Sequence, residues 1–163
     1  MQGITRVGMA AAVILGAFLA LDAPTLRAQS KDPLVGTWDL DIHKSTFAGA
    51  PPIKRTMMFE AVPDGLKQEI STTTGGLADV TYHLTYTARF DGKDYPADVA
   101  SSLDTVSIKR IDPRTVERVG KVKGQVVQTE TYSVSSDGHM LTVTQQGRNN
   151  GVPFNSTQIF ERE

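Results

Sequence analysis

The sequence of 163 residues contains no cysteine. The protein therefore cannot form disulfides, even in a compartment that would permit them, and it has no thiolate to bind a metal or to carry a lipid anchor. Its stability must come from core burial and from backbone hydrogen bonds. Tryptophan is nearly as scarce, because the single one, Trp38, lies in the motif Gly36-Thr37-Trp38.

Neither sign of charge dominates the sequence. The chain has 17 Lys and Arg residues against 18 Asp and Glu residues, which gives a formal net charge of −1 at pH 7. A chain without a basic excess has no general electrostatic attraction for nucleic acid or for an anionic membrane surface. We therefore expect no nucleic-acid partner.

Long apolar runs are limited to one stretch near the N-terminus. This stretch, Val7 to Leu21, follows Arg6 and precedes the candidate cleavage sequence Leu26-Arg27-Ala28. These are the parts of a secretory signal peptide, and the run is shorter than the roughly 18 residues that span a bilayer. We predict a signal peptide over residues 1–28, one domain over residues 29–163, and a periplasmic or extracellular location. The alternative is a retained membrane anchor, and no further membrane span follows the leader.

Helical periodicity is also absent, since no window shows a sustained apolar repeat of 3.6 residues. Turn signals recur instead at short intervals, and runs rich in Val, Thr, Ile and Tyr lie between them. This pattern predicts an all-β chain of hairpins. The turn signals are Pro63-Asp64-Gly65, Gly75-Gly76, Asp91-Gly92, Asp112-Pro113, Lys123-Gly124, Asp137-Gly138 and Asn149-Asn150-Gly151.

The clearest strand covers residues 80–90, where apolar residues from Val80 to Phe90 alternate with polar ones. A period of two predicts one buried face and one wet face. The same alternation places Trp38, Leu40 and Ile42 on one face of the first strand. About 8–10 strands joined by short turns favour an antiparallel up-and-down barrel. A two-sheet sandwich is the alternative, although its crossovers need longer connections.

Polar residues interrupt the apolar faces of the later strands. Gln128 and Glu130 share a face with Val126, Tyr132 and Val134. Arg118 shares a face with Val116 and Val122, and Ser156 and Gln158 lie between Phe154 and Phe160. If these faces point inward, the barrel encloses a polar patch in which Arg118 and Glu130 need a partner, because an isolated buried charge is costly. The alternative is that a bulge reverses the assignment and these side chains meet solvent.

Four segments carry a resemblance to known families: Gly36 to Leu40, Phe90-Asp91-Gly92, Asp137 to Thr144, and Thr157 to Glu161. In order and spacing they resemble landmarks of the fatty-acid-binding proteins and of the wider lipocalin (calycin) superfamily. The first two segments, together with Asp104-Thr105-Val106 through Ile111-Asp112, also resemble a group of small exported bacterial lipocalin-like proteins of uncharacterised function. The resemblance implies a barrel whose lumen takes a hydrophobic molecule.

The chain departs from the fatty-acid-binding pattern at two places. That family holds the fatty-acid carboxylate partly through an Arg-x-Tyr pair in its last strand, and the matching positions here are Gln158 and Phe160. The family also places a two-helix lid after its first strand, whereas the segment from His43 to Pro52 is too short for two helices and ends in two prolines. Arg118 could replace the missing charged partner.

We find no sequence motif for catalysis or for cofactor binding. The three histidines, His43, His83 and His139, are too far apart in sequence to form a metal-binding pair. No nucleophile elbow, phosphate-binding glycine loop or metalloprotease helix is present. We therefore expect no metal, no cofactor and no enzymatic activity.

The leading hypothesis is an exported, monomeric lipocalin-like protein that binds a small, mostly hydrophobic ligand in its lumen. Trp38 would close one end of the barrel as a structural residue. The alternatives are a filled barrel that binds another protein, as an inhibitor or an envelope component, and an enzyme that uses the lumen as its active site. The candidate ligand-binding residues are Tyr82, Tyr86, Arg118, Glu130, Tyr132, Gln158 and Phe160.

Overall fold

The computed structural model describes residues 32–98, 102–149 and 151–163, so the signal peptide expected over residues 1–28 lies outside the described residues. The described residues contain ten strands and no helix, and therefore no helix among them is long and apolar enough to cross a membrane. The strands are β1 (Gly36–Thr46), β2 (Lys54–Val62), β3 (Gly65–Thr74), β4 (Val80–Arg89), β5 (Tyr95–Pro96), β6 (Thr105–Asp112), β7 (Thr115–Val122), β8 (Gln125–Val134), β9 (Met140–Asn149) and β10 (Val152–Arg162).

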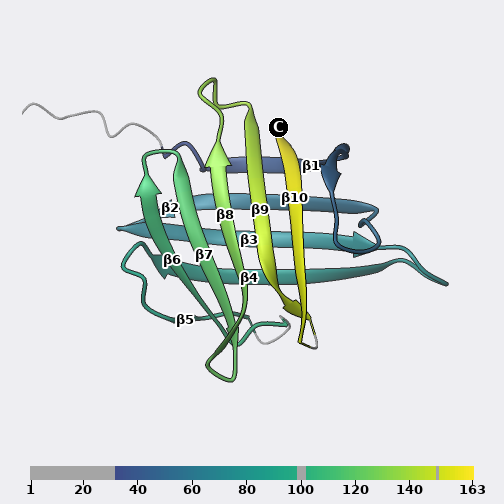
Figure 1. Ribbon diagram of the computed structural model, residues 1–163. Coiled ribbons are helices and arrows are strands. Elements are labelled where there is room, and N and C mark those ends of the chain that lie inside the picture. Colours follow the sequence, from purple (N-terminus) through teal and green to yellow (C-terminus); the bar gives the residue numbers. More distant parts are fainter. Residues whose placement is uncertain (1–31, 99–101, 150) are drawn as a thin grey trace, which may run out of the picture.

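All ten strands belong to one antiparallel sheet with the order β4-β3-β2-β1-β10-β9-β8-β7-β6-β5 (Figure 1). The first and last long strands pair directly, with Trp38 opposite Arg162 and Leu40 opposite Phe160. The two outer ends of the sheet meet through only a few contacts, including a bridge between Tyr86 and Ala97. The predicted all-β, up-and-down barrel is confirmed, and it is nearly closed.

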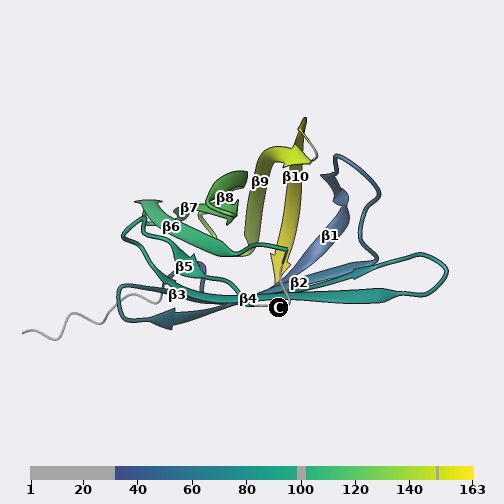
Figure 2. The same cartoon turned by 90° about the horizontal axis from the view of Figure 1, so that it is seen from below.

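The sheet folds over on itself into two layers. Strands β1–β4 run crosswise to β6–β10 in Figure 1, and Figure 2 shows β2–β4 lying along one side of the molecule with β6–β10 on the other. Side chains from the inner faces of the two layers pack against each other over part of the space between them, as in an orthogonal β-packing. The core residues from both layers form one cluster that includes Met57, Phe59, Tyr86, Val116 and Tyr132.

The turn signals seen in the sequence lie between strands or at their ends. Pro63 and Asp64 connect β2 to β3, and Lys123 and Gly124 connect β7 to β8. Lys123 and Gly124 both have positive φ angles, of 50° and 75°, as a two-residue hairpin turn with the twist of its flanking strands requires. The connection from β1 to β2 is short and contains no helix. The barrel therefore has no helical lid.

A bulge in β8 corrects one face assignment. Gly120 pairs with Gln128 but Lys121 pairs with Val126, so Val127 is an extra residue in the ladder. The extra residue reverses the faces of the strand before it. Val126, which the alternation placed inside with Tyr132, is exposed, and Val127 packs against the core instead.

Gly147 allows the neighbouring strand to follow this bulge. A Cβ atom at position 147 would lie 2.3 Å from the carbonyl oxygen of Val127 and 2.9 Å from the ring of Phe154. No side chain fits in that space, because the nearest atom is a backbone oxygen, which cannot move aside as a flexible side chain could. The bulge in β8 therefore depends on a glycine opposite it in β9.

Trp38 lies at the end of β1 opposite to the loop that leads to β2, and its side chain is fully buried. Its indole Nε1 donates a hydrogen bond to the carbonyl of Leu34 at 2.8 Å. The guanidinium of Arg162 lies over the indole, 4.0 Å from the ring centroid. Arg162 also donates to the carbonyls of Gly138, Val35 and Pro33. This one side chain therefore joins the last strand, the indole and the segment before β1.

We predict that Arg162→Lys lowers the free energy of unfolding by about 1–3 kcal/mol, because an ammonium cannot stack on Trp38 and reach three carbonyls in different directions. Urea denaturation followed by Trp38 fluorescence measures the change. Arg114→Lys, at an exposed position, is the control and should leave the urea midpoint unchanged. Equal effects of the two substitutions would contradict the role given to Arg162.

Candidate ligand-binding site

Six polar or charged side chains are buried among the described residues. Of these, Gln68, Arg118, Glu130, Ser156 and Gln158 lie on inward faces of β3, β7, β8 and β10, between apolar neighbours in the alternation. The alternation that fills the core with apolar residues thus also carries polar groups into it. Such groups need hydrogen bonds or opposite charges, because water no longer solvates them.

Arg118 and Glu130 form a buried ion pair. They face each other across β7 and β8, and Nη2 of Arg118 lies 2.7 Å from Oε2 of Glu130. The side chains are 1% and 7% exposed. Either charge buried alone would destabilise the fold strongly. The main effect of the pair is therefore that each charge compensates the other.

Three neutral side chains extend this pair across the lumen. The hydroxyl of Tyr132 donates a short hydrogen bond to Oε2 of Glu130, and the amide of Gln68 donates to the Tyr132 oxygen at 3.4 Å. The hydroxyl of Tyr86 in turn donates to Oε1 of Gln68. The chain from Arg118 to Tyr86 therefore connects β7 and β8 with β3 and β4, on the opposite layer.

The ionisation of these groups follows from their burial. Burial by itself would lower the pKa of Arg118, but the carboxylate of Glu130 and the phenols of Tyr132 and Tyr86 raise that pKa above its ordinary value. Burial raises the pKa of Tyr86 and of Tyr132. At neutral pH the site therefore holds a cationic Arg118 and two protonated phenols that act as donors.

Arg118 has more hydrogen-bonding capacity than its partners use. Its Nε and Nη1 atoms are buried without a hydrogen-bond partner, and its guanidinium lies 5.8 Å from the ring centroid of Tyr86. Buried donors are normally paired. Two nitrogens of one buried cation therefore keep hydrogen-bond donor capacity that the described residues do not use.

A second polar group lies nearer the open end of the barrel. Arg55 donates from Nη1 to Oε1 of Gln158 at 2.6 Å and from Nε to the hydroxyl of Thr72 at 2.9 Å. From Gln158 the hydrogen bonds continue through Ser156 and Gln145 to Gln128. Burial lowers the pKa of Arg55, but a guanidinium remains protonated in proteins.

A cavity of about 530 Å³, the inner cavity, lies between the layers beside these groups. Its apolar lining residues Met57, Ile70 and Leu84 come from β2, β3 and β4. The facing layer contributes polar groups, including Arg118 and Glu130. The inner cavity therefore offers an apolar wall and a charged, hydrogen-bonding wall to one molecule.

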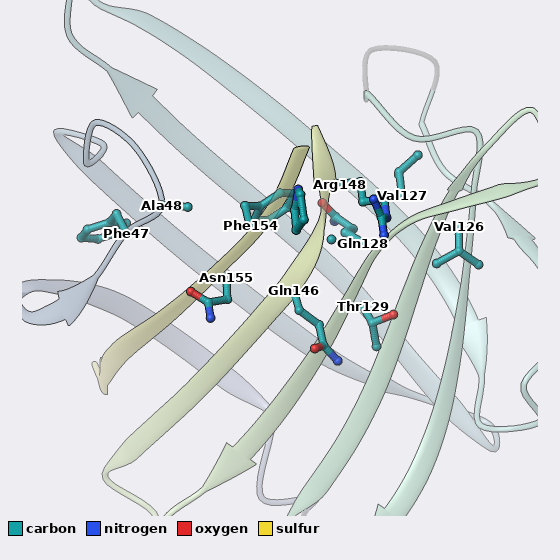
Figure 3. A pocket seen from close by; sticks show the side chains of 12 residues that line it. Phe47, Ala48, Val126, Val127, Gln128, Thr129, Gln146, Arg148, Phe154 and Asn155 are labelled. Carbon is teal, nitrogen blue, oxygen red and sulfur yellow. The ribbon is translucent and has the colours of Figure 1, made fainter. Parts of the chain in front are cut away.

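The inner cavity leads to a wider mouth groove of about 990 Å³. Arg55 and Gln128 are among the residues that line both spaces. An adjoining hollow of about 760 Å³ lies at the same end of the barrel. Figure 3 shows Phe47 and Ala48 on one side of it and Val126 on the other. The lumen is thus accessible from the end of the barrel opposite to Trp38.

The structure brings most of the sequence-predicted residues together. Tyr86, Arg118, Glu130 and Tyr132 belong to the connected polar chain, and Arg118 and Glu130 line the inner cavity. Gln158 belongs to the second polar group through Arg55. The remaining two candidate ligand-binding residues lie apart: Phe160 is fully buried in the core, and Tyr82 is 57% exposed at the rim of the inner cavity. Trp38, which was predicted as a structural residue, is fully buried.

Sequence reasoning missed Gln68 and Arg55, although the alternation contained both. Gln68 lies midway between the apolar residues Leu66 and Ile70 in the sequence, and Arg55 precedes Met57 by two residues on the same strand. A systematic extension of period two along β2 and β3 would have placed both side chains inside.

Within the described residues, no group of three or more His, Cys, Asp or Glu side chains is placed to hold a metal ion. His43, His83 and His139 are all exposed. The site described above is built from amide and hydroxyl groups, one carboxylate and two guanidinium groups.

No protein-family model matches the sequence, and no curated protein matches it. Among solved structures, the chain is similar to As-p18, an extracellular fatty acid binding protein, with a TM-score of 0.52 and 16% sequence identity. The similarity covers 81% of this chain and 97% of that one. At this identity the likeness shows a shared fatty-acid-binding-protein-like barrel fold.

We predict that Glu130→Gln lowers the free energy of unfolding by about 3–5 kcal/mol, because it leaves Arg118 as an uncompensated buried charge. The double variant Arg118→Met, Glu130→Met should lose less free energy of unfolding than Glu130→Gln alone, because it removes both charges of the pair. Glu117→Gln, on the opposite face of β7, is the matched control and should have little effect. Denaturant unfolding of the four proteins measures these differences, and a double variant less stable than Glu130→Gln would contradict a compensating pair.

Proposed function

We propose that this protein is an exported binding protein that takes a small, mostly hydrophobic ligand into its barrel lumen. The observation that carries the proposal is the inner cavity of about 530 Å³ with Arg118 in its wall. Ligand cavities are of this size and combine apolar walls with a few polar groups that fix orientation.

The lining supports a ligand with one polar end. Met57, Ile70 and Leu84 would contact an apolar body, and the two unpaired nitrogens of Arg118 would donate to an acceptor group. The carboxylate of Glu130 already neutralises the charge of Arg118. The acceptor at Arg118 therefore need not be charged.

The cavity also favours this function over a filled barrel that acts only through its outer surface. A filled barrel would place packed side chains across the axis beside Arg118, where this structure has open volume. The fold likeness to an extracellular fatty acid binding protein agrees with a ligand-binding role. We propose that the protein works as a monomer and is not an enzyme, and that the leader of residues 1–28 directs its export.

Native mass spectrometry of the protein purified from its exporting cell, followed by extraction of bound small molecules, tests the proposal directly. We expect repeated recovery of one compound or one chemical series at a one-to-one ratio. The mass of the protein in the same spectrum should also show that the leader has been cleaved near Ala28. Consistent recovery of the bare protein mass, under conditions that preserve weak complexes, would count against the proposal.

We further predict that Leu84→Trp lowers the affinity for the neutral apolar dye N-phenyl-1-naphthylamine by at least about tenfold, because the introduced indole ring occupies part of the inner cavity. Thr87→Trp, on the exposed face of the same strand, is the control. Fluorescence titration measures both affinities, and unfolding curves verify that both variants fold. Equal affinities would place the dye outside the inner cavity.

A further inference from the structure

We propose that Arg55 is an anion-binding residue that makes the lumen selective for ligands with a single negative charge. This inference rests on the proposed function, since it assigns the charge of the ligand that the lumen takes. It places that charge near the mouth of the barrel rather than at the buried pair of Arg118 and Glu130.

The charges around the cavity leave Arg55 without a carboxylate of its own. Glu130 is bound to Arg118 at 2.7 Å, and the two hydrogen bonds of Arg55 go to the uncharged groups of Thr72 and Gln158. Among the described residues that line the inner cavity, two guanidinium groups therefore face one carboxylate. One negative charge on a ligand would bring the net charge of these three groups and the ligand to zero.

The position of Arg55 suits this role because it lines both the inner cavity and the mouth groove. A ligand whose apolar part enters the inner cavity would leave its charged end at this junction. Among the described residues, the charged side chains that line the mouth groove are Arg55 and Arg148, and both are positive. The groove therefore differs in sign from the whole chain, which has a formal net charge of −1. An anion therefore meets a favourable potential along its entry path.

The guanidinium of Arg55 is also held in place before a ligand binds. Its Nε is fixed by Thr72 on β3, and its Nη1 is fixed by Gln158 on β10. The amide of Gln158 is in turn bonded to Ser156. These contacts leave Nη2 free of any hydrogen bond to the described residues, so a preorganised, charge-assisted donor is available for a carboxylate or sulfonate oxygen.

Two dyes that differ by one sulfonate test the inference: 8-anilinonaphthalene-1-sulfonate and N-phenyl-1-naphthylamine. We expect Arg55→Gln to weaken binding of the sulfonate dye by about 10- to 100-fold, as the loss of one charge-assisted hydrogen bond requires. Binding of the neutral dye should change by less than about twofold. Arg55→Lys should retain part of the preference because it retains the charge.

Lys54→Gln is the matched control, since it removes one positive charge from the adjacent, exposed residue of β2. It should leave both affinities unchanged. Equal weakening of both dyes by Arg55→Gln would show a structural role for Arg55 and overturn the inference, while the proposed function would stand. Loss of the sulfonate preference in Arg118→Gln but not in Arg55→Gln would also overturn it. If the unmodified protein binds neither dye, the proposed function itself fails.

Discussion

The buried ion pair of Arg118 and Glu130 is the constraint on which the interior of this barrel depends. Two charges in the lumen require neighbours that accept or donate hydrogen bonds, and Tyr132, Gln68 and Tyr86 provide them in a continuous chain. The chain crosses from one layer of the sheet to the other. The inner cavity lies beside this chain of hydrogen bonds.

The fold could be predicted from the sequence because it depends on local patterns. Turn residues and period-two alternation are read from neighbouring positions, so a chain of about 8–10 antiparallel strands followed from short segments. Val126 could not be placed, because a bulge depends on the partner strand, where Gly147 leaves the space that the backbone of Val127 occupies. The incomplete pairing between the two ends of the sheet, β4 and β5, is likewise a property of the whole sheet.

The site was predictable to a lesser extent, for a related reason. Arg118 and Glu130 stood out as charges among apolar residues, and their pairing across β7 and β8 follows from the hairpin register. Arg55 forms its bond to Gln158 with a residue 103 positions away, and no local pattern indicates such a contact. The division of charge between a neutralised deep pair and an unbalanced outer arginine emerges only when the barrel closes.

The pairing of β1 with β10 has a consequence for how the chain reaches this structure. Trp38 and Arg162 stand opposite each other in the sheet, yet they are almost as far apart in sequence as the described chain allows. Contacts between distant residues make folding slow, because the loop must close before the contact repays its entropy. The barrel cannot be completed until β10 has been synthesised, so the closure of its core must follow the synthesis of that strand.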